Sequence, residues 1–194
     1  MPLREGSTAP DFQTTDMFGS AVRLSDLRGR PVLLSFMRYA SCPMCNLRVR
    51  ELALAHERLS REGLVMLVVF QSTAESMKEY VGRQDAPFAL IPDPDMSLYR
   101  LFEVERGWAG LLAPGNAVHA VKAFSKGFAP GRIEGPFNRL PADFLIGPDG
   151  RIGQAFYART AGEHVPLGDV SAWLKHNAPV SSTKAAAPDQ RLSR

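Results

Sequence analysis

The stretch "PVLLSFMRYASCPMCNLRVREL", residues 31–52, holds both cysteines of the chain, Cys42 and Cys45. Its first part belongs to a nearly continuous apolar run over residues 30–38, which is typical of a central strand buried on both faces of a sheet. After the cysteines, apolar or small residues recur at helical spacing up to Gly63, a residue that often ends helices. These residues are Val49, Leu52, Ala55 and Leu59. The stretch therefore predicts a buried strand, a turn that carries two thiols, and a helix.

The alternation of strand and helix patterns continues on both sides of this stretch. Residues 11–27 predict an N-terminal hairpin around a Phe18-Gly19-Ser20 turn, and residues 141–158 a closing hairpin around a Pro148-Asp149-Gly150 turn. The remaining patterns predict strands at 64–70 and 88–93 and helices at 72–84, 95–104 and 168–178. Buried strands that alternate with helices predict an α/β fold with helices on both faces of the sheet.

Residues 104–138 are rich in Gly and Pro around a possible helix at 117–124, and we interpret them as an insertion that covers a site. Its residues Trp108 and His119 could line a pocket, but packing of the loop onto the core is the preferred interpretation. His56, on the first predicted helix, is expected at the boundary between core and surface. We predict one domain over residues 1–178 and a disordered tail over residues 179–194, where small and polar residues dominate.

The bulk composition excludes several classes of protein. Hydrophobic residues make up 45% and charged residues 22% of the chain, as in soluble globular proteins. The longest apolar run, residues 64–70, is too short to span a bilayer, and the N-terminus lacks the apolar core of a signal peptide. We therefore expect a cytoplasmic protein without a membrane partner. The net charge of +3 arises mainly in the last fourteen residues, so no nucleic-acid partner is expected.

A pair of cysteines separated by two residues, near a β-α-β pattern, is typical of a redox motif. A closed zinc site needs four ligands, and the four histidines of this chain have no paired ligand spacing. A structural disulfide would close a very short loop and would be reduced in the cytoplasm. Two inert buried thiols remain an alternative. We favour a redox pair, with no metal and no cofactor.

The position of the pair in the fold supports this interpretation. Pro43 suits the first turn of a helix, where its missing N–H costs nothing. The unpaired N–H groups at a helix N-terminus stabilise a thiolate. In α/β sheets, ligands bind beyond the carboxyl ends of the strands, where Cys42 and Cys45 are expected to lie. The second thiol is close enough to resolve an intermediate formed on the first.

Three segments in this order resemble the alkyl hydroperoxide reductase/thiol-specific antioxidant (AhpC/TSA) superfamily, the peroxiredoxins and their relatives. They are "GSTAPDF…LSDLRGRPVLLSFMR", "RYASCPMCNLRVREL" and "LPADFLIGPDGRI". The resemblance implies a thioredoxin fold, in which helices flank a central mixed sheet. It also implies a thiol-dependent oxidoreductase with antioxidant activity, which reduces a peroxide with electrons from a cellular dithiol and has a thioredoxin- or glutathione-type reductant as its partner. A homodimer is a further possibility that the resemblance raises.

The resemblance also implies roles for residues near the cysteines. A cis-proline precedes a late strand in this fold, and Pro141 matches its position. Peroxiredoxins carry a Thr three residues before the attacking cysteine, where this chain has Cys42, and an Arg at the position of Pro141. Both departures point toward thioredoxin, in which the first cysteine attacks. The roles therefore stay open: Cys45 attacks peroxide and Cys42 resolves, or the reverse holds in a protein-disulfide reductase.

Charged residues flank the predicted site in the sequence. Arg38 and Arg139 could supply positive charge to it or could be solvated on the surface. Asp143 could carry a proton to a cysteine, although an ion pair with Arg139 is the preferred interpretation. A hypothesis of another class is a non-catalytic redox sensor or partner-binding module, in which oxidation of the pair alters the loop at 109–136.

Overall fold

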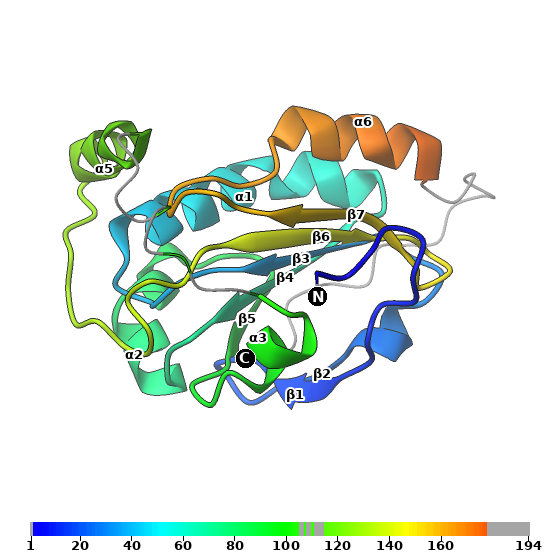
Figure 1. Cartoon of the computed structure of the whole chain (residues 1–194), viewed down its shortest axis with the longest axis horizontal. Coiled ribbons are helices and arrows are strands. Elements are labelled where there is room, and N and C mark those ends of the chain that lie inside the picture. Colours follow the sequence, from blue (N-terminus) through cyan, green and yellow to red (C-terminus); the bar gives the residue numbers. More distant parts are fainter. Residues whose placement is uncertain (1, 105–106, 108–109, 111–114, 178–194) are drawn as a thin grey trace.

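A five-stranded mixed sheet forms the centre of the computed structural model, which describes residues 2–104, 107, 110 and 115–177 (Figure 1). The strands lie in the order β5-β4-β3-β6-β7. They are β3 Val32–Phe36, β4 Val65–Phe70, β5 Ala89–Pro92, β6 Ala142–Ile146 and β7 Ile152–Tyr157. Strands β3, β4 and β5 run parallel, whereas β6 is antiparallel to both of its neighbours. The three predicted central strands and the closing hairpin are thus confirmed.

Helices cover both faces of the sheet, as the sequence predicts. The helices are α1 Pro43–Arg61, α2 Ala74–Glu79, α3 Ser97–Leu101, α5 Gly115–Ser125 and α6 Leu167–Asn177, with 3-10 turns η1 Leu24–Leu27 and η2 Val81–Gln84. Helices α1 and α6 lie along one face, and α3 lies on the other with the hairpin of β1 Gln13–Thr15 and β2 Ala21–Arg23 (Figure 1). The predicted N-terminal hairpin is therefore confirmed.

The alternation of side chains along β3 divides the core into two layers. Leu33 packs in the layer under α1 and α6, whereas Leu34 and Phe36 pack in the layer under α3 and the hairpin. The second layer contains an aromatic cluster in which Phe36 lies 5.3 Å from Phe102 and 5.8 Å from Phe144 between ring centroids. Because β3 is covered on both faces, its sequence is apolar almost throughout.

Helix α1 follows its sequence pattern closely. Pro43 occupies the first turn, and the helix ends at Glu62 followed by Gly63, whose φ of +89° favours glycine. The predicted core positions Val49, Leu52 and Leu59 are completely buried. In the described part of the chain, no helix combines the length and the hydrophobicity needed to cross a bilayer.

Several helix boundaries differ from the sequence pattern, and α3 covers only residues 97–101 of the helix expected over 95–104. The single helix expected over 72–84 breaks at Tyr80, which joins α2 to η2. Gly82, a poor helix former, lies two residues after this break, and a Cβ there would lie 3.1 Å from the carbonyl oxygen of Met77. The helix expected over 117–124 forms α5 and extends by two residues at its start and one at its end. Residues 179–194, predicted to be disordered, lie outside the described residues.

The expectation of a cis-proline at position 141 is wrong. The described residues contain no cis peptide bond, so Pro141 is trans. Its carbonyl accepts a hydrogen bond from the N–H of Ala158, which continues the β6–β7 ladder by one more pair. Pro141 does not begin an edge strand either, because β6 lies between β3 and β7.

The aromatic cluster predicts a large cost for Phe144→Ala. The side chain is fully buried on β6, and its ring lies 5.2 Å from Phe102 and 5.3 Å from Tyr157 between centroids. We expect the free energy of unfolding, measured by urea titration, to fall by about 3–5 kcal/mol. Leu54→Ala, on the exposed face of α1, is the control and should change it by less than about 0.5 kcal/mol. Equal effects of the two substitutions would contradict this picture of the core.

Candidate active site

Both cysteines lie at the start of α1, beyond the carboxyl end of β3, as the sequence predicts. Cys42 is the N-cap residue, with φ −68° and ψ 119°, and Cys45 lies in the first turn. The carbonyl of Cys42 accepts the N–H of Asn46, the first bond of the helix. Neither residue is more than 1% exposed, so the pair sits below the surface at a helix N-terminus.

The two residues form a close pair of free thiols. They approach each other to 3.0 Å and are not joined by a disulfide. The backbone N–H of Arg38 donates to Sγ of Cys45 over 3.4 Å, and Nη1 of Arg38 lies 3.8 Å from Sγ of Cys42. Arg38 therefore contacts both sulfur atoms, one through its backbone and one through its side chain.

These surroundings give the two thiols different pKa values. Burial raises the pKa of Cys42, but the hydrogen bond from Cys45, the charge of Arg38 and the N–H groups at the helix start lower it to about 7. Burial also raises the pKa of Cys45, and there the negative charge of the Cys42 thiolate adds to the effect. At neutral pH the pair therefore favours a thiolate at Cys42 that accepts a hydrogen bond from the Cys45 thiol.

Two aromatic rings hold the Arg38 side chain in place. Its guanidinium lies 5.1 Å from the ring centroid of Tyr39 and 5.1 Å from that of Phe137, and the two rings are stacked. Nη2 also donates to the carbonyl of Phe137. Such cation–π contacts strengthen when the cation is desolvated, and Arg38 is only 2% exposed. Of the two alternatives for Arg38, a solvated position on the surface is excluded by this burial, and the guanidinium lies beside Cys42 instead.

Arg139 is also buried, but on the other layer of the core. Its Nη1 donates to the carbonyl of Val104, Nη2 lies 3.1 Å from Sδ of Met96, and its guanidinium covers the ring of Tyr99 at 5.0 Å. Tyr99 in turn donates to the carbonyl of Met37, directly after β3. A surface position for Arg139 is therefore wrong. These contacts indicate that Arg139 supports the loop beneath the cysteines.

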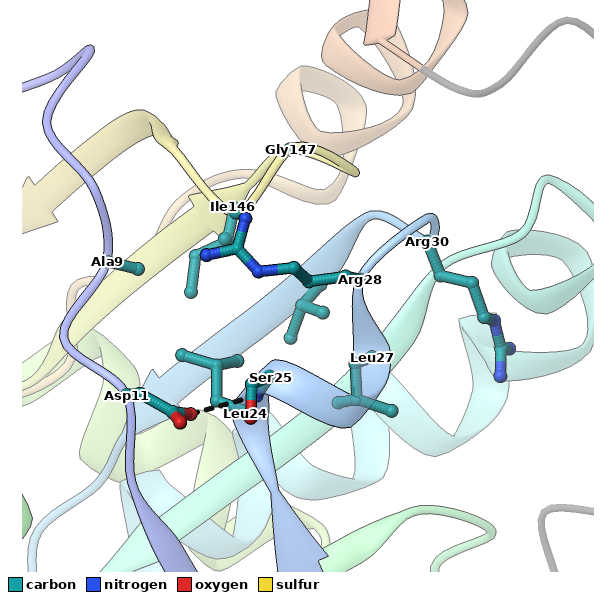
Figure 2. Close-up of a pocket in the computed structure, with 11 residues that line it drawn as sticks. Ala9, Asp11, Leu24, Ser25, Leu27, Arg28, Arg30, Ile146 and Gly147 are labelled. Carbon is teal, nitrogen blue, oxygen red and sulfur yellow. Dashed lines mark hydrogen bonds between the residues drawn. The ribbon is translucent and has the colours of Figure 1, made fainter.

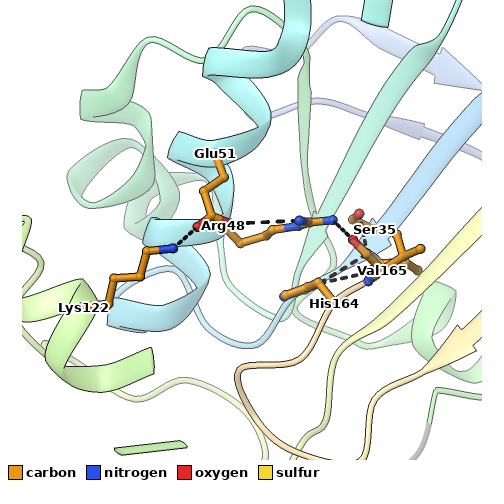
Figure 3. A network of polar contacts seen from close by, with 7 residues as sticks. Ser35, Arg48, Glu51, Lys122, His164 and Val165 are labelled. Carbon is orange, nitrogen blue, oxygen red and sulfur yellow. Dashed lines mark hydrogen bonds and ion pairs between the residues drawn. The ribbon is translucent and has the colours of Figure 1, made fainter. Parts of the chain in front are cut away.

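The expected ion pair between Asp143 and Arg139 is wrong as well, because the two side chains belong to different layers. Asp143 is buried, accepts the hydroxyl of Ser35 over 2.6 Å and the N–H of Val165 over 2.7 Å, and lies 3.1 Å from Nδ1 of His164. Nη2 of Arg48, on α1, donates to the carbonyl of Val165 (Figure 3). This network ties the segment before α6 to β3, β6 and α1.

The other residues that the sequence singled out lie away from the thiols. His56 is partly buried, hydrogen-bonds Ser60 and lies 6.0 Å from the ring of Phe88, as expected for a boundary residue. The ring of His119 packs so closely on Gly162 that a Cβ there would lie 2.7 Å from it. This contact supports the interpretation that the insertion packs onto the core. Trp108 lies outside the described residues.

Three partners of the site were missed by sequence reasoning. Ser41 donates from its hydroxyl to the carbonyl of Arg132, and Nε2 of Gln71 donates to the carbonyls of Glu134 and Pro136. Phe137 completes the aromatic pair around Arg38. The sequence indicated that residues 104–138 cover a site, but only the adjacency of Tyr39 to Arg38 hinted at an aromatic contact, and no local pattern indicated the individual contacts of residues 132–137.

Two hollows offer room for a ligand. A small cavity of about 30 Å³ lies among Ala9, Leu24 and Ile146, at the end of the sheet opposite the cysteines, and has room for about one water molecule (Figure 2). An open groove of about 910 Å³ runs beside α1 and is lined by residues from Asn46 to Gly131. Within the described residues, no group of three or more His, Cys, Asp or Glu side chains could hold a metal ion.

Comparison with known proteins supports the family resemblance that the sequence indicates. A model of the AhpC/TSA family matches residues 6–155. Peroxiredoxin Bcp from Escherichia coli (strain K12) is 26% identical over 179 residues, which cover 91% of this chain and 99% of that protein.

Solved structures show the same fold. Peroxidoxin BcpB from Mycobacterium tuberculosis aligns with a TM-score of 0.67 at 18% identity, over 93% of this chain and 99% of that one. The thioredoxin domain of a thiol-disulfide oxidoreductase from Bacteroides vulgatus aligns with a TM-score of 0.52 at 18% identity, over 89% and 99% of the two chains. The predicted thioredoxin fold is thus confirmed.

Removal of the Arg38 charge should raise the pKa of Cys42. We expect the thiolate absorbance near 240 nm to rise with a midpoint of about 7 in the wild type. In Arg38→Met the midpoint should move up by about one unit or more, because an opposite charge at contact distance favours the thiolate. The control is Arg50→Met, which removes an exposed arginine from α1 and should leave the midpoint unchanged. An unchanged midpoint in Arg38→Met would show that the guanidinium does not stabilise the thiolate.

The Asp143 network predicts a specific loss of stability in acid. Burial raises the pKa of Asp143, but the charge and hydrogen bond of His164, the charge of Arg48 and the Ser35 hydroxyl lower it from 3.8 to about 2. Because the pKa of Asp143 is lowered, its ionised carboxylate stabilises the fold by about 2 kcal/mol at pH values above the ordinary pKa. This contribution disappears as the pH falls from about 4 to about 2.

Asp143→Asn should therefore lose stability at pH 7, and its unfolding free energy should fall less steeply between pH 4 and pH 2 than that of the wild type. Urea titrations at a series of pH values measure both effects. The control is Asp95→Asn, an exposed carboxylate before α3, which should keep the wild-type slope. Equal slopes for Asp143→Asn and the wild type would show that the network around Asp143 does not lower the pKa of its carboxyl group.

Proposed function

Because the chain belongs to the AhpC/TSA family, we propose that it is a thiol-dependent oxidoreductase with antioxidant activity, which reduces a peroxide by cycling Cys42 and Cys45 between dithiol and disulfide. One observation carries the proposal: a thiolate stabilised by Arg38 lies against a second, protonated thiol. This arrangement contains a nucleophile, a proton donor and a resolving group in a single turn of helix.

Cys42 is the attacking residue in this proposal. Its pKa of about 7 provides a large thiolate fraction at neutral pH, whereas the pKa of Cys45 is raised. The Arg38 guanidinium beside Cys42 also suits the negative charge that develops on a peroxide oxygen when its O–O bond breaks. The acidity difference thus favours the thioredoxin-like order, with Cys45 as the resolving thiol, over the order that the sequence predicts for peroxide reduction, in which Cys45 attacks.

Each step of the cycle can be written with these groups. The Cys42 thiolate attacks one peroxide oxygen, the O–O bond breaks, and the leaving alkoxide takes the proton of the Cys45 thiol to form an alcohol. Cys42 is then a sulfenic acid and Cys45 a thiolate. The Cys45 thiolate attacks Sγ of Cys42, hydroxide leaves as water after protonation, and the Cys42–Cys45 disulfide forms. A dithiol returns two electrons and two protons to the pair.

The electron donor in this proposal is a thioredoxin- or glutathione-type thiol in a reducing cytoplasm, and the protein acts as a monomer or homodimer. A protein-disulfide reductase is the second candidate function. The acidity of Cys42 favours it, because the first cysteine of a C-x-x-C pair is the attacking thiol in thioredoxin-type exchange. A redox sensor, the third candidate, would oxidise without turnover.

Single-cysteine variants test the cycle. Reduced protein receives one equivalent of hydrogen peroxide in the presence of dimedone, which traps sulfenic acids. We expect Cys45→Ser to be labelled on Cys42, Cys42→Ser to stay unlabelled, and the wild type to form a disulfide instead. Both variants should lose turnover, measured as steady consumption of a dithiol reductant.

The same proteins in denaturant are the control for intrinsic thiol reactivity. Labelling of Cys45 in Cys42→Ser would reverse the roles, and wild-type turnover in either variant would exclude a two-thiol cycle. Peroxide reaction no faster than in denaturant would remove peroxide reduction from the proposal. Wild-type oxidation without steady consumption of reductant would favour the sensor.

A further inference from the structure

A segment of the chain itself lies against the loop that carries Cys42. Residues 131–137, part of the connection from α5 to β6, pass the end of the sheet where β6 begins (Figure 1). Ser41, which precedes Cys42, and Arg38, which contacts it, donate hydrogen bonds to this segment. Because both thiols are at most 1% exposed, a partner sulfur reaches Cys42 only after surrounding parts of the chain move.

The segment is held through its backbone carbonyls. Ser41 donates to the carbonyl of Arg132, Gln71 to those of Glu134 and Pro136 over 2.7 Å and 3.0 Å, and Arg38 to that of Phe137. In the described part of the chain, no backbone hydrogen bond joins residues 131–137 to the sheet. The three donor side chains come from two loops, Arg38 and Ser41 from the loop between β3 and α1 and Gln71 from the loop after β4, so the segment lies in a site that the rest of the fold provides.

The contacts are those of a bound polypeptide backbone. The carbonyls of residues 132, 134, 136 and 137 accept hydrogen bonds from the donors, and the segment bends at Gly135, whose φ is +65°. Glu134 and Pro136 are partly buried, whereas Ile133 and Phe137 are exposed. Gly135 passes so close that a Cβ there would lie 3.2 Å from the amide of Gln71. Recognition through backbone carbonyls does not depend on which side chains the bound segment carries.

The donors are themselves well fixed. Ser41, Gln71 and Arg38 are each at most 2% exposed. The N–H of Gln71 donates to the carbonyl of Arg38, so the ends of β3 and β4 hold the two side chains next to each other. Donors that are buried and pre-positioned lose little freedom when a ligand binds, which favours binding of a chain that offers carbonyls.

We propose that Ser41, Gln71 and Arg38 form a binding site for the backbone of a polypeptide, and that residues 131–137 occupy it until a partner chain carrying the reacting sulfur displaces them. This inference rests on the proposed dithiol cycle and names the class of its exchange partner: a polypeptide that presents its cysteine between backbone carbonyls. The open groove of about 910 Å³, which reaches Gly131, offers room for the rest of the partner chain.

The exchange step is a thiol–disulfide substitution. In the reductive direction, the partner thiolate attacks Sγ of Cys42 in the Cys42–Cys45 disulfide, and Cys45 leaves as a thiolate that takes a proton. A second partner thiolate then attacks the partner sulfur of this mixed disulfide. The Cys42 thiolate is released, and the partner dithiol has become a disulfide.

A pair of disulfide probes tests the site. One is the capped pentapeptide Ala-Ala-Cys-Ala-Ala with its cysteine as a 2-pyridyl disulfide, and the other is a capped single cysteine with the same leaving group. The Cys42 thiolate attacks the cysteine sulfur and releases 2-thiopyridone, which is followed by its absorbance at 343 nm. We expect the reduced native protein to react with the pentapeptide at least about tenfold faster than with the single cysteine, because several hydrogen bonds form only with the peptide.

Substitution of the donors should remove this preference. Gln71→Leu and Ser41→Ala should each lower the ratio of the two rate constants about threefold to tenfold, as the loss of one or two hydrogen bonds predicts. Gln13→Leu, which removes an exposed amide from β1, should keep the wild-type ratio. An equal ratio in native and denatured protein, or a preference that both donor variants retain, would overturn the proposal.

Displacement of the segment has its own readout, which does not depend on the donor variants. In Cys45→Ser the probe stays attached to Cys42, and trypsin cleaves after Arg132 only when residues 131–137 leave the site. We expect cleavage at Arg132 to be at least about threefold faster in the pentapeptide adduct than in the single-cysteine adduct. Equal cleavage rates would overturn displacement.

The outcomes also separate this inference from the proposed function. Rapid oxidation by peroxide with equal rates for the two probes would leave the dithiol cycle intact and remove the polypeptide site. Failure of both peroxide and probes to react faster than in denaturant would remove the proposed function itself.

Discussion

The contact between the Arg38 guanidinium and Sγ of Cys42 connects most features of the site. A buried cation is costly unless an anion or hydrogen-bond acceptors compensate it. Here the compensation comes from the Cys42 thiolate, the carbonyl of Phe137 and two aromatic faces. The same contact lowers the pKa of Cys42 and brings residues 131–137 over the pair. One buried charge thus contributes both to the acidity of the thiol and to the position of residues 131–137.

This contact relies on the central sheet. Arg38 follows β3, which β4 and β6 hold on either side, and the N–H of Gln71 at the end of β4 bonds the Arg38 carbonyl. Below the loop, Tyr99 donates to the carbonyl of Met37 and carries the guanidinium of Arg139 on its ring. The loop between strand and helix is thus fixed from several directions, so that the backbone N–H of Arg38 reaches Sγ of Cys45.

Sequence reasoning succeeded where a local pattern carried the information and failed where two distant segments meet. Helix α1 could be predicted because its apolar spacing, Pro43 and Gly63 are all local signals. The pairing of Arg139 with Asp143 was wrong because side chains close in the sequence lie on opposite layers of the sheet. The partner of Asp143 is His164, twenty-one residues away, and no local pattern indicates that contact.

The sequence by itself determined the alternation of strands and helices and the N-terminal position of Cys42 and Cys45 on a helix, and it predicted a redox role for the pair, since period, turn residues and spacing are properties of neighbouring residues. Only the tertiary structure decided which thiol is acidic and which contacts residues 131–137 make around it. Both depend on Arg38, Gln71 and residues 131–137, which are brought together by packing across the ends of β3, β4 and β6. Electrostatic effects act through space, so their outcome is fixed only when the whole chain has folded.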